Sequence, residues 1–448
     1  MRMKTNSLRD ILLTFAAGSL EVLEHMAGLR KGDIVGMCLR LLELKGEAAA
    51  ISLAHKIFTT YKNLSNRNRI QFFERLLTEF IPDSDALNQA ITAYQRAPST
   101  TTLAALETAV ESPRRELFRL LNMEPDGTAS LISMRKDLRD ILADRPHLKP
   151  LDGDFVHLFQ SWFNRGFLQL ERISWKTPAF ILEKLIAYES VHEIRGWDDL
   201  RRRLADDRRC FAFFHPALPD EPLIFVEVAL VKGLASSIQE VLSAEIPVPG
   251  TALKANAAIF YSINNCQPGL AGVSFGSFLI KQVTDSMAEE MPALEYYATL
   301  SPVPGFRAWL KEQVANESAA GLSEAERSCL SQLDDSSWHE HDVKTQQFKP
   351  LLMHLCAYYL LNAKRDAEPR DAVARFHLRN GARLERINWL GDRSEKGLRE
   401  SAGLLVNYLY DRNVVARNHE RYVNENEIVH SPAIKQLVNE RPHKSRAN

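Results

Sequence analysis

The segment AAIFYSINNCQPGLAGVSFGSFLIKQVTDSM, residues 257–287, decides the fold of the second half of the chain. It opens with a β-branched and aromatic run that predicts a strand, and it then passes through a loop that contains several glycines. The loop leads directly into an amphipathic pattern that predicts a helix, and LEYYATLSPV, residues 294–303, returns as another strand. This order of elements predicts that the second half is built on a sheet.

Neighbouring segments indicate how the rest of that sheet is made. The runs RCFAFFHPA, residues 209–217, and PLIFVEVALV, residues 222–231, are separated only by the short polar stretch LPDE and predict an antiparallel hairpin. A helical segment, QFKPLLMHLCAYYLLNAK at 347–364, and the alternating run GLLVNYLY at 403–410 follow. Together they predict an α+β domain with a mostly antiparallel sheet.

The first part of the chain has a different texture, which changes near residue 165. Segments such as AAAISLAHKIFTTYKNL (48–64), RIQFFERLLTEFI (69–81) and GDFVHLFQSWFNRGF (153–167) carry apolar residues at helical spacing. They predict an all-helical bundle over residues 1–165 and the α+β domain over 166–448. The helical part does not concentrate the residue types that catalysis requires, so we expect scaffolding or assembly from it.

Composition excludes several classes of protein. The 448 residues include 56 basic and 57 acidic side chains, so no global charge favours nucleic acid or an anionic membrane. The five cysteines form no CxxC pair, which argues against a disulfide framework or a zinc site and favours a reducing compartment. No apolar run is long enough to span a bilayer, and the pattern over residues 8–23 predicts an amphipathic helix rather than a signal peptide. We therefore expect a cytoplasmic protein.

The glycine loop is the first stretch with chemical content. Free N–H groups and the positive end of the following helix face any anion that lies across Gly272 and Gly276, which suits a pyrophosphate. Gly269, Gly272 and Gly276 do not follow the dinucleotide-binding spacing, however, and close backbone packing explains such glycines equally well. Both interpretations stay open.

Ser301 stands out because of the residues around it. Pro302 and Pro304 follow at once, and they fix the backbone and remove two donors. This predicts that Ser301 sits where the chain can neither continue a sheet nor enter a helix. An ordinary turn serine is the alternative to a serine held for chemistry.

His377 is the second candidate. It falls on what the pattern predicts to be a last helical turn, closed by Asn380 and Gly381. A lone histidine beside Phe376 and Leu378 often satisfies only a core hydrogen bond, and a serine and a histidine distant in sequence make no catalytic pair without measured geometry.

Four segments nevertheless resemble one family: GFLQLERISW (166–175), FYSINNCQPGLAGVSFGSFLIKQV (260–283), TLSPVPGF (299–306) and FHLRNGARLERINWLGDRSEKGLRESAGLLVNY (376–408). Over residues 150–410 the chain resembles the malonyl-CoA decarboxylases. The resemblance implies a GNAT-like acyltransferase fold for the C-terminal domain, with CoA between splayed strands and its pyrophosphate over the loop after the third long strand. It also implies that the N-terminal helices form a homo-oligomer, which we expect to be a tetramer.

The resemblance places the family's catalytic serine on Ser301 and its catalytic histidine on His377. Ser301 is then a hydrogen-bond donor to the malonyl group and His377 the general acid, although these roles can be exchanged or shared. No metal or organic cofactor is implied, because the thioester carbonyl itself accepts the electrons that CO2 leaves behind. The residues expected to bind the substrate are Gly272, Ser274, Gly276 and Pro302.

One departure from the family concerns the glycine loop. Where animal members carry Gln and Glu, this chain has Ala271 and Ser274, so a carboxylate that could orient His377 is missing. Another acid, the Ser274 hydroxyl, or no partner at all remain as alternatives. Two further functions also stay open: an acyl-CoA-dependent acyltransferase of the same fold, and a non-catalytic CoA-binding assembly protein.

Overall fold

The computed structural model describes residues 33–243, 245, 250–273, 279–316, 322–335 and 337–439. The helix predicted over residues 8–23 lies outside these residues. The chain divides into two compact units. The helical unit contains the described residues up to 168 together with two later segments, 215–220 and 267–273, and the sheet unit contains the remainder.

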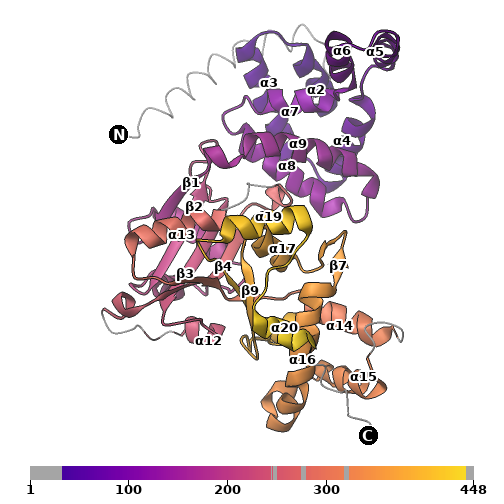
Figure 1. Ribbon diagram of the computed structural model, residues 1–448. Helices are drawn as coiled ribbons and strands as arrows, with labels where there is room; N and C mark the ends of the chain where they lie inside the picture. Colours follow the sequence, from indigo (N-terminus) through magenta and orange to yellow (C-terminus); the bar gives the residue numbers. More distant parts are fainter. Residues whose placement is uncertain are drawn as a thin grey trace. The chain divides into compact units, whose positions relative to one another are not determined.

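The regular elements of the helical unit are α-helices and 3-10 turns, as the sequence predicts (Figure 1), and residues 215–220 add one isolated β-bridge between His215 and Leu218. Its α-helices are α2 (Ile34–Glu43), α3 (Glu47–Lys62), α4 (Asn66–Glu79), α5 (Ser84–Arg96), α6 (Thr100–Val110), α7 (Pro113–Leu121), α8 (Gly127–Ile141) and α9 (Lys149–Trp162). Its 3-10 turns are η1 (Pro146–Leu148), η2 (Arg165–Phe167) and η4 (Pro268–Leu270).

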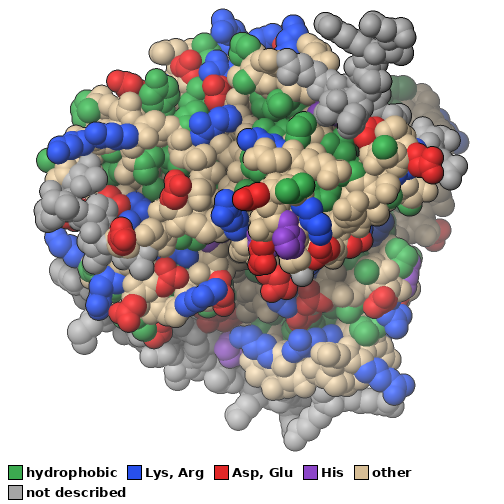
Figure 2. All heavy atoms as spheres, turned by 90° about the horizontal axis from the view of Figure 1, so that it is seen from below, with side chains coloured by type: hydrophobic (Ala, Val, Ile, Leu, Met, Phe, Trp, Pro, Cys, Tyr) green, Lys and Arg blue, Asp and Glu red, His purple; other side chains and the backbone are tan. Residues whose placement is uncertain are grey.

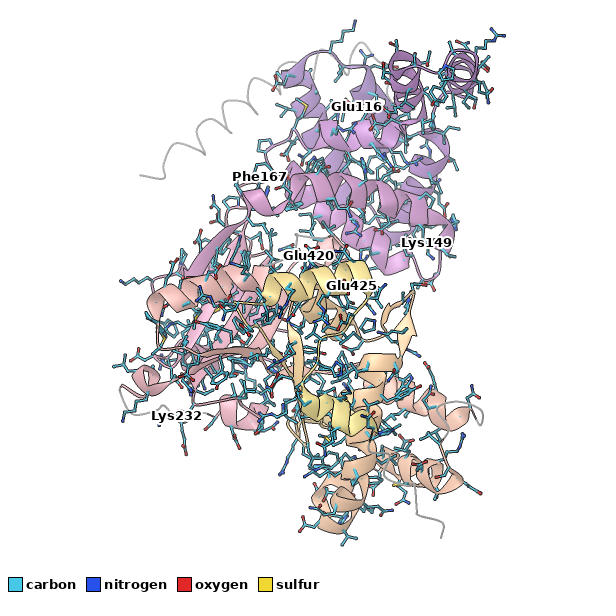
Figure 3. All side chains as sticks on the ribbon, viewed as in Figure 1. Glu116, Lys149, Phe167, Lys232, Glu420 and Glu425 are labelled. Atoms are coloured by element: carbon cyan, nitrogen blue, oxygen red, sulfur yellow. The ribbon has the colours of Figure 1, made fainter. Side chains whose placement is uncertain are left out.

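Local signals set where these helices begin. The side chains of Asp33, Ser65 and Ser112 each accept a hydrogen bond from a backbone N–H in the first turn of the helix that follows. Behind these caps the apolar faces meet, and side chains fill the space between the helices (Figure 3). The rings of Phe118 and Phe155, both fully buried, stack with their centroids 4.2 Å apart. Capping and apolar periodicity thus explain this unit.

The sheet unit carries the strands. They are β1 (Gln169–Ile173), β2 (Arg208–Phe214), β3 (Ile224–Val231), β4 (Ala257–Asn265), β5 (Tyr296–Thr299), β6 (Ser301–Pro302), β7 (Lys364–Arg365), β8 (Glu368–Pro369), β9 (Arg383–Asn388) and β10 (Leu405–Leu409). The main sheet has the order β1-β2-β3-β4-β5-β10-β6, with β9 also paired to β10, and β7 and β8 pair separately.

All pairs in the main sheet are antiparallel except β4 with β5, which are parallel. A parallel pair needs a crossover connection, and the loop with the following helix α13 (Leu279–Glu290) supplies it. The predicted hairpin of β2 and β3 is present. The predicted fold class, a helical N-terminal part followed by an α+β domain with a mostly antiparallel sheet, is confirmed.

Helices cover both faces of this sheet. Residues of α10 (Ala179–Tyr188), α11 (Trp197–Arg203) and α12 (Ile238–Val241) join the inward side chains of β3 in two core clusters. Figure 1 shows α13 and α19 (Val415–Glu425) together on the opposite side from α12. The other helices are α14 (Phe306–Ala315), α15 (Glu324–Ser331), α16 (Asp342–Asn362), α17 (Ala372–Arg379), α18 (Glu395–Ser401) and α20 (Pro432–Asn439). The 3-10 turns are η3 (Thr251–Lys254), η5 (Gln332–Asp334) and η6 (Trp338–Glu340).

Surface chemistry agrees with the balanced composition. On the face shown in Figure 2, basic and acidic side chains are interspersed with polar and apolar ones. Across the part of the chain that the structure describes, no helix is long and apolar enough to cross a membrane.

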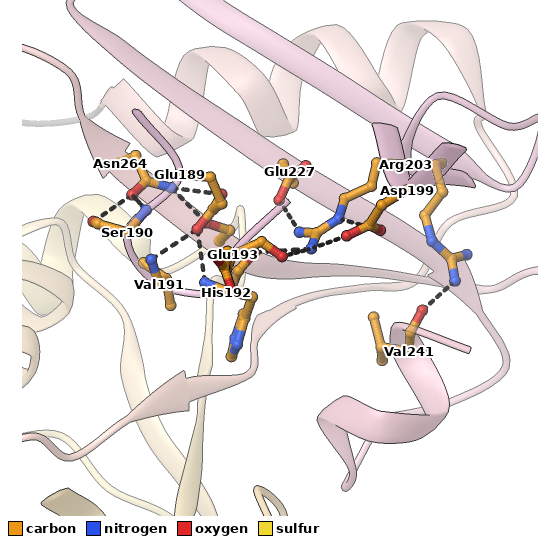
Figure 4. A network of polar contacts seen from close by, with 12 residues as sticks. Glu189, Ser190, Val191, His192, Glu193, Asp199, Arg203, Glu227, Val241 and Asn264 are labelled. Atoms are coloured by element: carbon orange, nitrogen blue, oxygen red, sulfur yellow. Dashed lines mark hydrogen bonds and ion pairs between the residues drawn. The ribbon is translucent and has the colours of Figure 1, made fainter. Parts of the chain in front are cut away.

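A buried network of charged side chains links α11 to the sheet (Figure 4). Arg203 donates from Nη1 to Oε2 of Glu227 over 2.9 Å, and Glu227 is also hydrogen bonded to the carboxylate of Glu189. Glu189 accepts further hydrogen bonds, each 2.8 Å long, from Val191 N, His192 N, Ser262 Oγ and Asn264 Nδ2. Burial raises the pKa of Glu227 well above its usual value, against the effect of Arg203, and Glu189 adds to the rise. We therefore expect Glu227 to hold its proton at neutral pH.

The substitution Glu227→Gln tests this assignment. A carboxyl whose pKa is higher in the folded than in the unfolded state stabilises the fold less as the pH rises above its ordinary unfolded pKa. The amide introduced by the substitution cannot ionise, so we expect the melting temperature of the variant to rise relative to the wild type between about pH 5 and pH 8. Circular dichroism melts at several pH values measure this difference.

Glu227→Ala provides the contrast. It removes the hydrogen bond that the buried guanidinium of Arg203 donates to this carboxyl group, and a hydrogen bond to a charged group contributes about 1.5–3 kcal/mol of stability. If the wild type and Glu227→Gln lost stability in parallel as the pH rose, Glu227 would not be the protonated group.

Candidate active site

Ser301 and His377 meet in the sheet unit, although 76 positions separate them in the sequence. The Ser301 Oγ and the His377 Nε2 lie 3.0 Å apart, within hydrogen-bonding distance. Both side chains are buried, with 6% and 2% of their residues' surface exposed. The two candidates that were uninformative alone therefore form one polar contact inside the fold.

The sheet holds Ser301 in place, contrary to the sequence-based expectation. Leu300 donates its N–H to Phe260 O over 3.0 Å, and Ser301 and Pro302 then pair with Val406 and Leu405 as the short strand β6. The expectation that the chain cannot continue a sheet here was wrong. β6 lies at the end of the strand order, and an edge strand tolerates proline because one side of its backbone has no ladder to complete.

His377 lies in the last turn of α17, as predicted. The helix begins where the Asp371 side chain accepts the N–H of Ala374 over 2.8 Å. It ends at Arg379 with Asn380 as its C-cap, and Gly381 follows with a φ of +80°. Gly381 N bonds to Leu378 O over 2.9 Å and Ala382 N bonds to His377 O over 3.1 Å, which is the Schellman arrangement. The predicted glycine cap is confirmed, and it fixes the turn that carries the imidazole.

The second ring nitrogen of His377 has a partner that the sequence did not reveal. Tyr410, which directly follows β10, places its Oη 2.8 Å from His377 Nδ1. The ring of Tyr408, two positions earlier, stacks on the imidazole with centroids 4.6 Å apart and an interplanar angle of 25°. A tyrosine hydroxyl was not among the expected partners. The alternating run at 403–410 was recognised as a strand, but nothing in that pattern marks which tyrosine reaches a histidine.

Burial keeps both groups neutral. It lowers the pKa of His377 to about 3 and raises the pKa of Tyr410 well above its usual value. In each case burial is the only cause, and no neighbouring charge contributes to the shift within the described part of the chain. At neutral pH the site therefore contains an imidazole, a phenol and an aliphatic hydroxyl, none of them charged.

The hydrogen-bond directions follow from the partners that each group has. Among the described residues, the only acceptor bonded to the Tyr410 hydroxyl is His377 Nδ1, so this hydroxyl donates to Nδ1. The ring proton then resides on Nε2, which donates to Ser301 Oγ. This leaves the hydroxyl hydrogen of Ser301 available to a bound molecule. The opposite tautomer would leave the buried Tyr410 proton without an acceptor, which is costly.

The glycine loop belongs to the helical unit, and the structure separates the roles of its glycines. A Cβ on Gly269 would lie 2.0 Å from Ile132 O, so close packing requires this glycine. Gly272 has a φ of +78°, and a Cβ there would meet no described atom within 4 Å. Positive φ, and not crowding, is the reason for glycine at 272. Pro302 lies in β6, whereas Ser274 and Gly276 fall outside the described residues.

Within the described residues, no group of three or more His, Cys, Asp or Glu side chains could hold a metal ion. What the site offers instead is a chain of neutral hydrogen-bond donors that runs from Tyr410 through His377 to Ser301.

Two family models match this chain. A family model described as the malonyl-CoA decarboxylase N-terminal domain matches residues 80–163, and the model of the malonyl-CoA decarboxylase C-terminal domain matches residues 166–448.

Individual relatives agree. The mitochondrial malonyl-CoA decarboxylase of Anser anser anser is 38% identical over 356 residues, which cover 73% of this chain and 70% of that protein. The crystal structure of malonyl-CoA decarboxylase from Rhodopseudomonas palustris is similar with a TM-score of 0.88 at 46% identity, over 91% of this chain and 100% of that one. For the enzyme from Agrobacterium vitis the TM-score is 0.86 at 47% identity, over 91% and 100% of the two chains. The chain belongs to the malonyl-CoA decarboxylase family.

Proposed function

We propose that this chain converts malonyl-CoA to acetyl-CoA and CO2. The observation that carries the proposal is the buried contact of 3.0 Å between Ser301 Oγ and His377 Nε2 in a member of this family. In the reaction the bond between the carboxylate carbon and Cα breaks. Its electron pair passes into the thioester carbonyl to form an enolate, CO2 leaves, and Cα takes up a proton.

Ser301 and His377 are assigned complementary roles in this reaction. The hydroxyl hydrogen of Ser301, which its contact with Nε2–H leaves free, donates to the malonyl group and stabilises the developing enolate. His377 supplies the proton from Nε2, either directly to carbon or through the Ser301 hydroxyl. A thioester enolate is a strong base, so a neutral N–H donor is acidic enough for this transfer.

Tyr410 completes the proton balance. As Nε2 gives up its proton, the Tyr410 hydroxyl passes its own proton to Nδ1 across their 2.8 Å contact. The negative charge that entered with the substrate carboxylate then ends on a phenolate instead of an imidazolate. Burial raises the pKa of Tyr410, but a phenol is intrinsically a stronger acid than a neutral imidazole N–H, so the charge is more easily accommodated on Tyr410 than on the ring. A proton from solvent then restores the site.

Substrate binding is assigned to the glycine loop and to the residues next to Ser301. Gly272 has a positive φ, and no described atom lies within 4 Å of where its Cβ would be, which suits the close approach of a CoA pyrophosphate to the backbone. Pro302 borders the reacting group through its place after Ser301 in β6. Ser274 and Gly276 are proposed for the same pyrophosphate site on the basis of the family resemblance.

A product assay separates this function from its alternatives. Incubation of the protein with malonyl-CoA, followed by mass spectrometry, should yield acetyl-CoA without any added acceptor. Transfer of the acyl group to an amine would support an acyltransferase, and CoA binding without CO2 release would support a silent assembly protein. Either of these results would contradict the proposal.

A cytoplasmic, homotetrameric state is a further part of the proposal. Cys38, Cys210, Cys266, Cys329 and Cys356 are all unpaired and buried, which fits a reducing compartment. Helices α5 and α6 pack on each other but contain no buried residue, although they carry exposed apolar side chains such as Leu103 and Val110. A helical hairpin whose apolar side chains are exposed in the single chain is suited to pack against a second copy.

Removing either central side chain should affect chemistry much more than binding. Ser301→Ala and His377→Asn are each expected to lower kcat by roughly 10²–10⁴-fold, because each removes a group that acts on the malonyl moiety in the transition state. The double variant should lose less than the product of the two effects. CO2 release measures kcat, and calorimetry with a nonreactive malonyl-CoA analogue measures affinity. If His377→Asn retained near-normal turnover, His377 would be a structural histidine.

Tyr410→Phe should lower kcat by about ten- to a hundredfold with little change in KM, because Nδ1 loses the donor that fixes the tautomer. In ¹⁵N NMR of the wild type, His377 should remain in the neutral Nε2–H form from about pH 5.5 to 8.5, since burial lowers its pKa to about 3.

Tyr422→Phe is the matched control for this prediction, because it removes another buried tyrosine hydroxyl, which bonds to Glu368 over 3.2 Å. It should leave kcat unchanged. A His377 ring that titrates near pH 6.5, or equal activities of the two variants, would contradict the assigned role of Tyr410.

The oligomer is tested with Leu103→Glu in α6, where 41% of the leucine is exposed in the single chain. A charge in a covered apolar interface is expensive, so the variant should have a lower mass by light scattering at micromolar concentration than a tetrameric wild type. Val343→Glu, at an 81% exposed position in α16, is the control and should keep the wild-type mass. A monomeric wild type would contradict the oligomer, and a tetrameric Leu103→Glu would contradict the role of this hairpin.

A further inference from the structure

The buried guanidinium of Arg135 in α8 contacts the glycine loop. Arg135 is 1% exposed, and its Nη1 donates to the backbone oxygen of Gly269 over 2.7 Å. The rest of its fork is held by Asp152, with Nε to Oδ1 at 2.8 Å and Nη2 to Oδ2 at 3.3 Å. The carboxylate therefore fixes the direction in which the guanidinium points, and the free edge points at the loop.

A second contact holds the loop from the same side of α8. Ile132 lies three residues before Arg135 and so shares its helical face. The backbone at Gly269 approaches Ile132 so closely that a Cβ would come within 2.0 Å of Ile132 O and 2.7 Å of its Cγ2. Charge-assisted hydrogen bonding and close packing thus act at one residue of the loop.

Beyond Gly269 the backbone forms a short turn. The turn η4 continues through three short-range bonds, from Leu270 N to Gln267 O at 2.8 Å, Ala271 N to Pro268 O at 3.2 Å and Val273 N to Leu270 O at 3.0 Å. Gly272 follows with its positive φ. Because these bonds are local, they set the shape of the turn, whereas the contacts of Gly269 with α8 set where that shape is held.

We propose that Arg135 is a positioning residue for CoA binding, acting through Gly269 on the backbone at Gly272. This inference rests on the proposed function, which assigns that backbone to the pyrophosphate. It gives the helical unit a part in substrate affinity, in addition to the assembly role expected of it. Loss of Arg135 should weaken CoA binding and leave the proton chemistry of Ser301 and His377 unchanged.

A purely structural role is the competing explanation, and the chain offers a matched control. Arg114 in α7 is 8% exposed and donates from Nε to Asp154 Oδ2 over 2.8 Å. Its Nη1 donates to the backbone oxygens of Leu77 and Phe80, which lie in or beside α4 and not in the glycine loop. Arg114→Ala and Arg135→Ala therefore each remove one buried arginine that pairs with an aspartate in the same unit, and only the second removes a contact with the loop. Asp154 keeps a second partner in Arg115, whose Nε lies 2.9 Å from Oδ1.

The experiment compares Arg135→Ala, Arg135→Lys and Arg114→Ala in the full-length protein. For Arg135→Ala we expect the KM for malonyl-CoA and the dissociation constant for CoA to rise about tenfold or more, with kcat within about threefold of the wild type. For Arg135→Lys, the KM and the dissociation constant should lie between those of the wild type and Arg135→Ala, because an ammonium cannot bridge Asp152 and Gly269 O as the guanidinium does. Arg114→Ala should lose about as much thermal stability as Arg135→Ala, while its KM for malonyl-CoA and its dissociation constant for CoA stay near those of the wild type.

Hydrogen exchange gives a readout that does not depend on turnover. Amides of the loop at 270–273 should exchange faster in Arg135→Ala than in the wild type or Arg114→Ala at equal distance from the melting temperature. An active wild type with unchanged KM and CoA affinity in Arg135→Ala would overturn the positioning role. If the wild type released no CO2, the proposed function would fail, and CoA affinity together with exchange would still decide whether Arg135 positions the loop. If Arg114→Ala weakened CoA binding equally, the effect would be general destabilisation and the inference would be wrong.

Discussion

The imidazole of His377 is buried, and each of its ring nitrogens needs a hydrogen-bond partner inside the fold. The strands of the sheet unit bring those partners together. A buried imidazole must stay neutral unless a negative charge is supplied, and no charged group contributes to its pKa shift within the described residues. The ring then needs one donor and one acceptor on opposite edges. Tyr410 and Ser301 provide them, at 2.8 and 3.0 Å. Each has to reach the ring from a different part of the chain.

Strand β10 brings these parts together because it pairs with β5, β6 and β9. Its ladder with β5 is short, and side chains bridge the remainder. Asn407 Nδ2 donates to Thr299 O over 2.7 Å, and Tyr408 N donates to Thr299 Oγ1 over 3.1 Å. Beyond them Tyr410 N donates to Tyr297 O over 2.7 Å. Thr299 and Asn407 are fully buried, so these bonds satisfy polar groups that would otherwise destabilise the sheet. They also fix the separation between Ser301 and Tyr410.

Sequence patterns predicted most of the fold and only part of the site. Periodicity identified the helical half, the hairpin of β2 and β3 and the cap at Gly381, because these depend on neighbours close in sequence. Boundaries were less accurate: α16 begins at Asp342 and continues through Pro350, where packing outweighs the local cost of proline. Tyr410 could not be assigned, since its contact with His377 spans 33 positions and results from strand pairing. The loop contact with α8 spans 134 positions and was equally hidden.

Among the described residues no charged group shifts the pKa of His377 or Tyr410, and this bears directly on the chemistry proposed for the site. Burial alone shifts the pKa values of His377 and Tyr410, and within the described residues neither they nor Ser301 has an ion pair. A cation there would stabilise the substrate carboxylate in the ground state and so oppose loss of CO2. Neutral donors act differently. They stabilise the charge of the substrate carboxylate less than water does, so the ground state gains little. They are already positioned to donate hydrogen bonds to the enolate, whose charge spreads over oxygen and carbon. Burial keeps His377 from becoming an imidazolium, and this is consistent with its use as a proton donor. A neutral imidazole N–H is a weak acid, so it gives its proton only to a base as strong as the enolate.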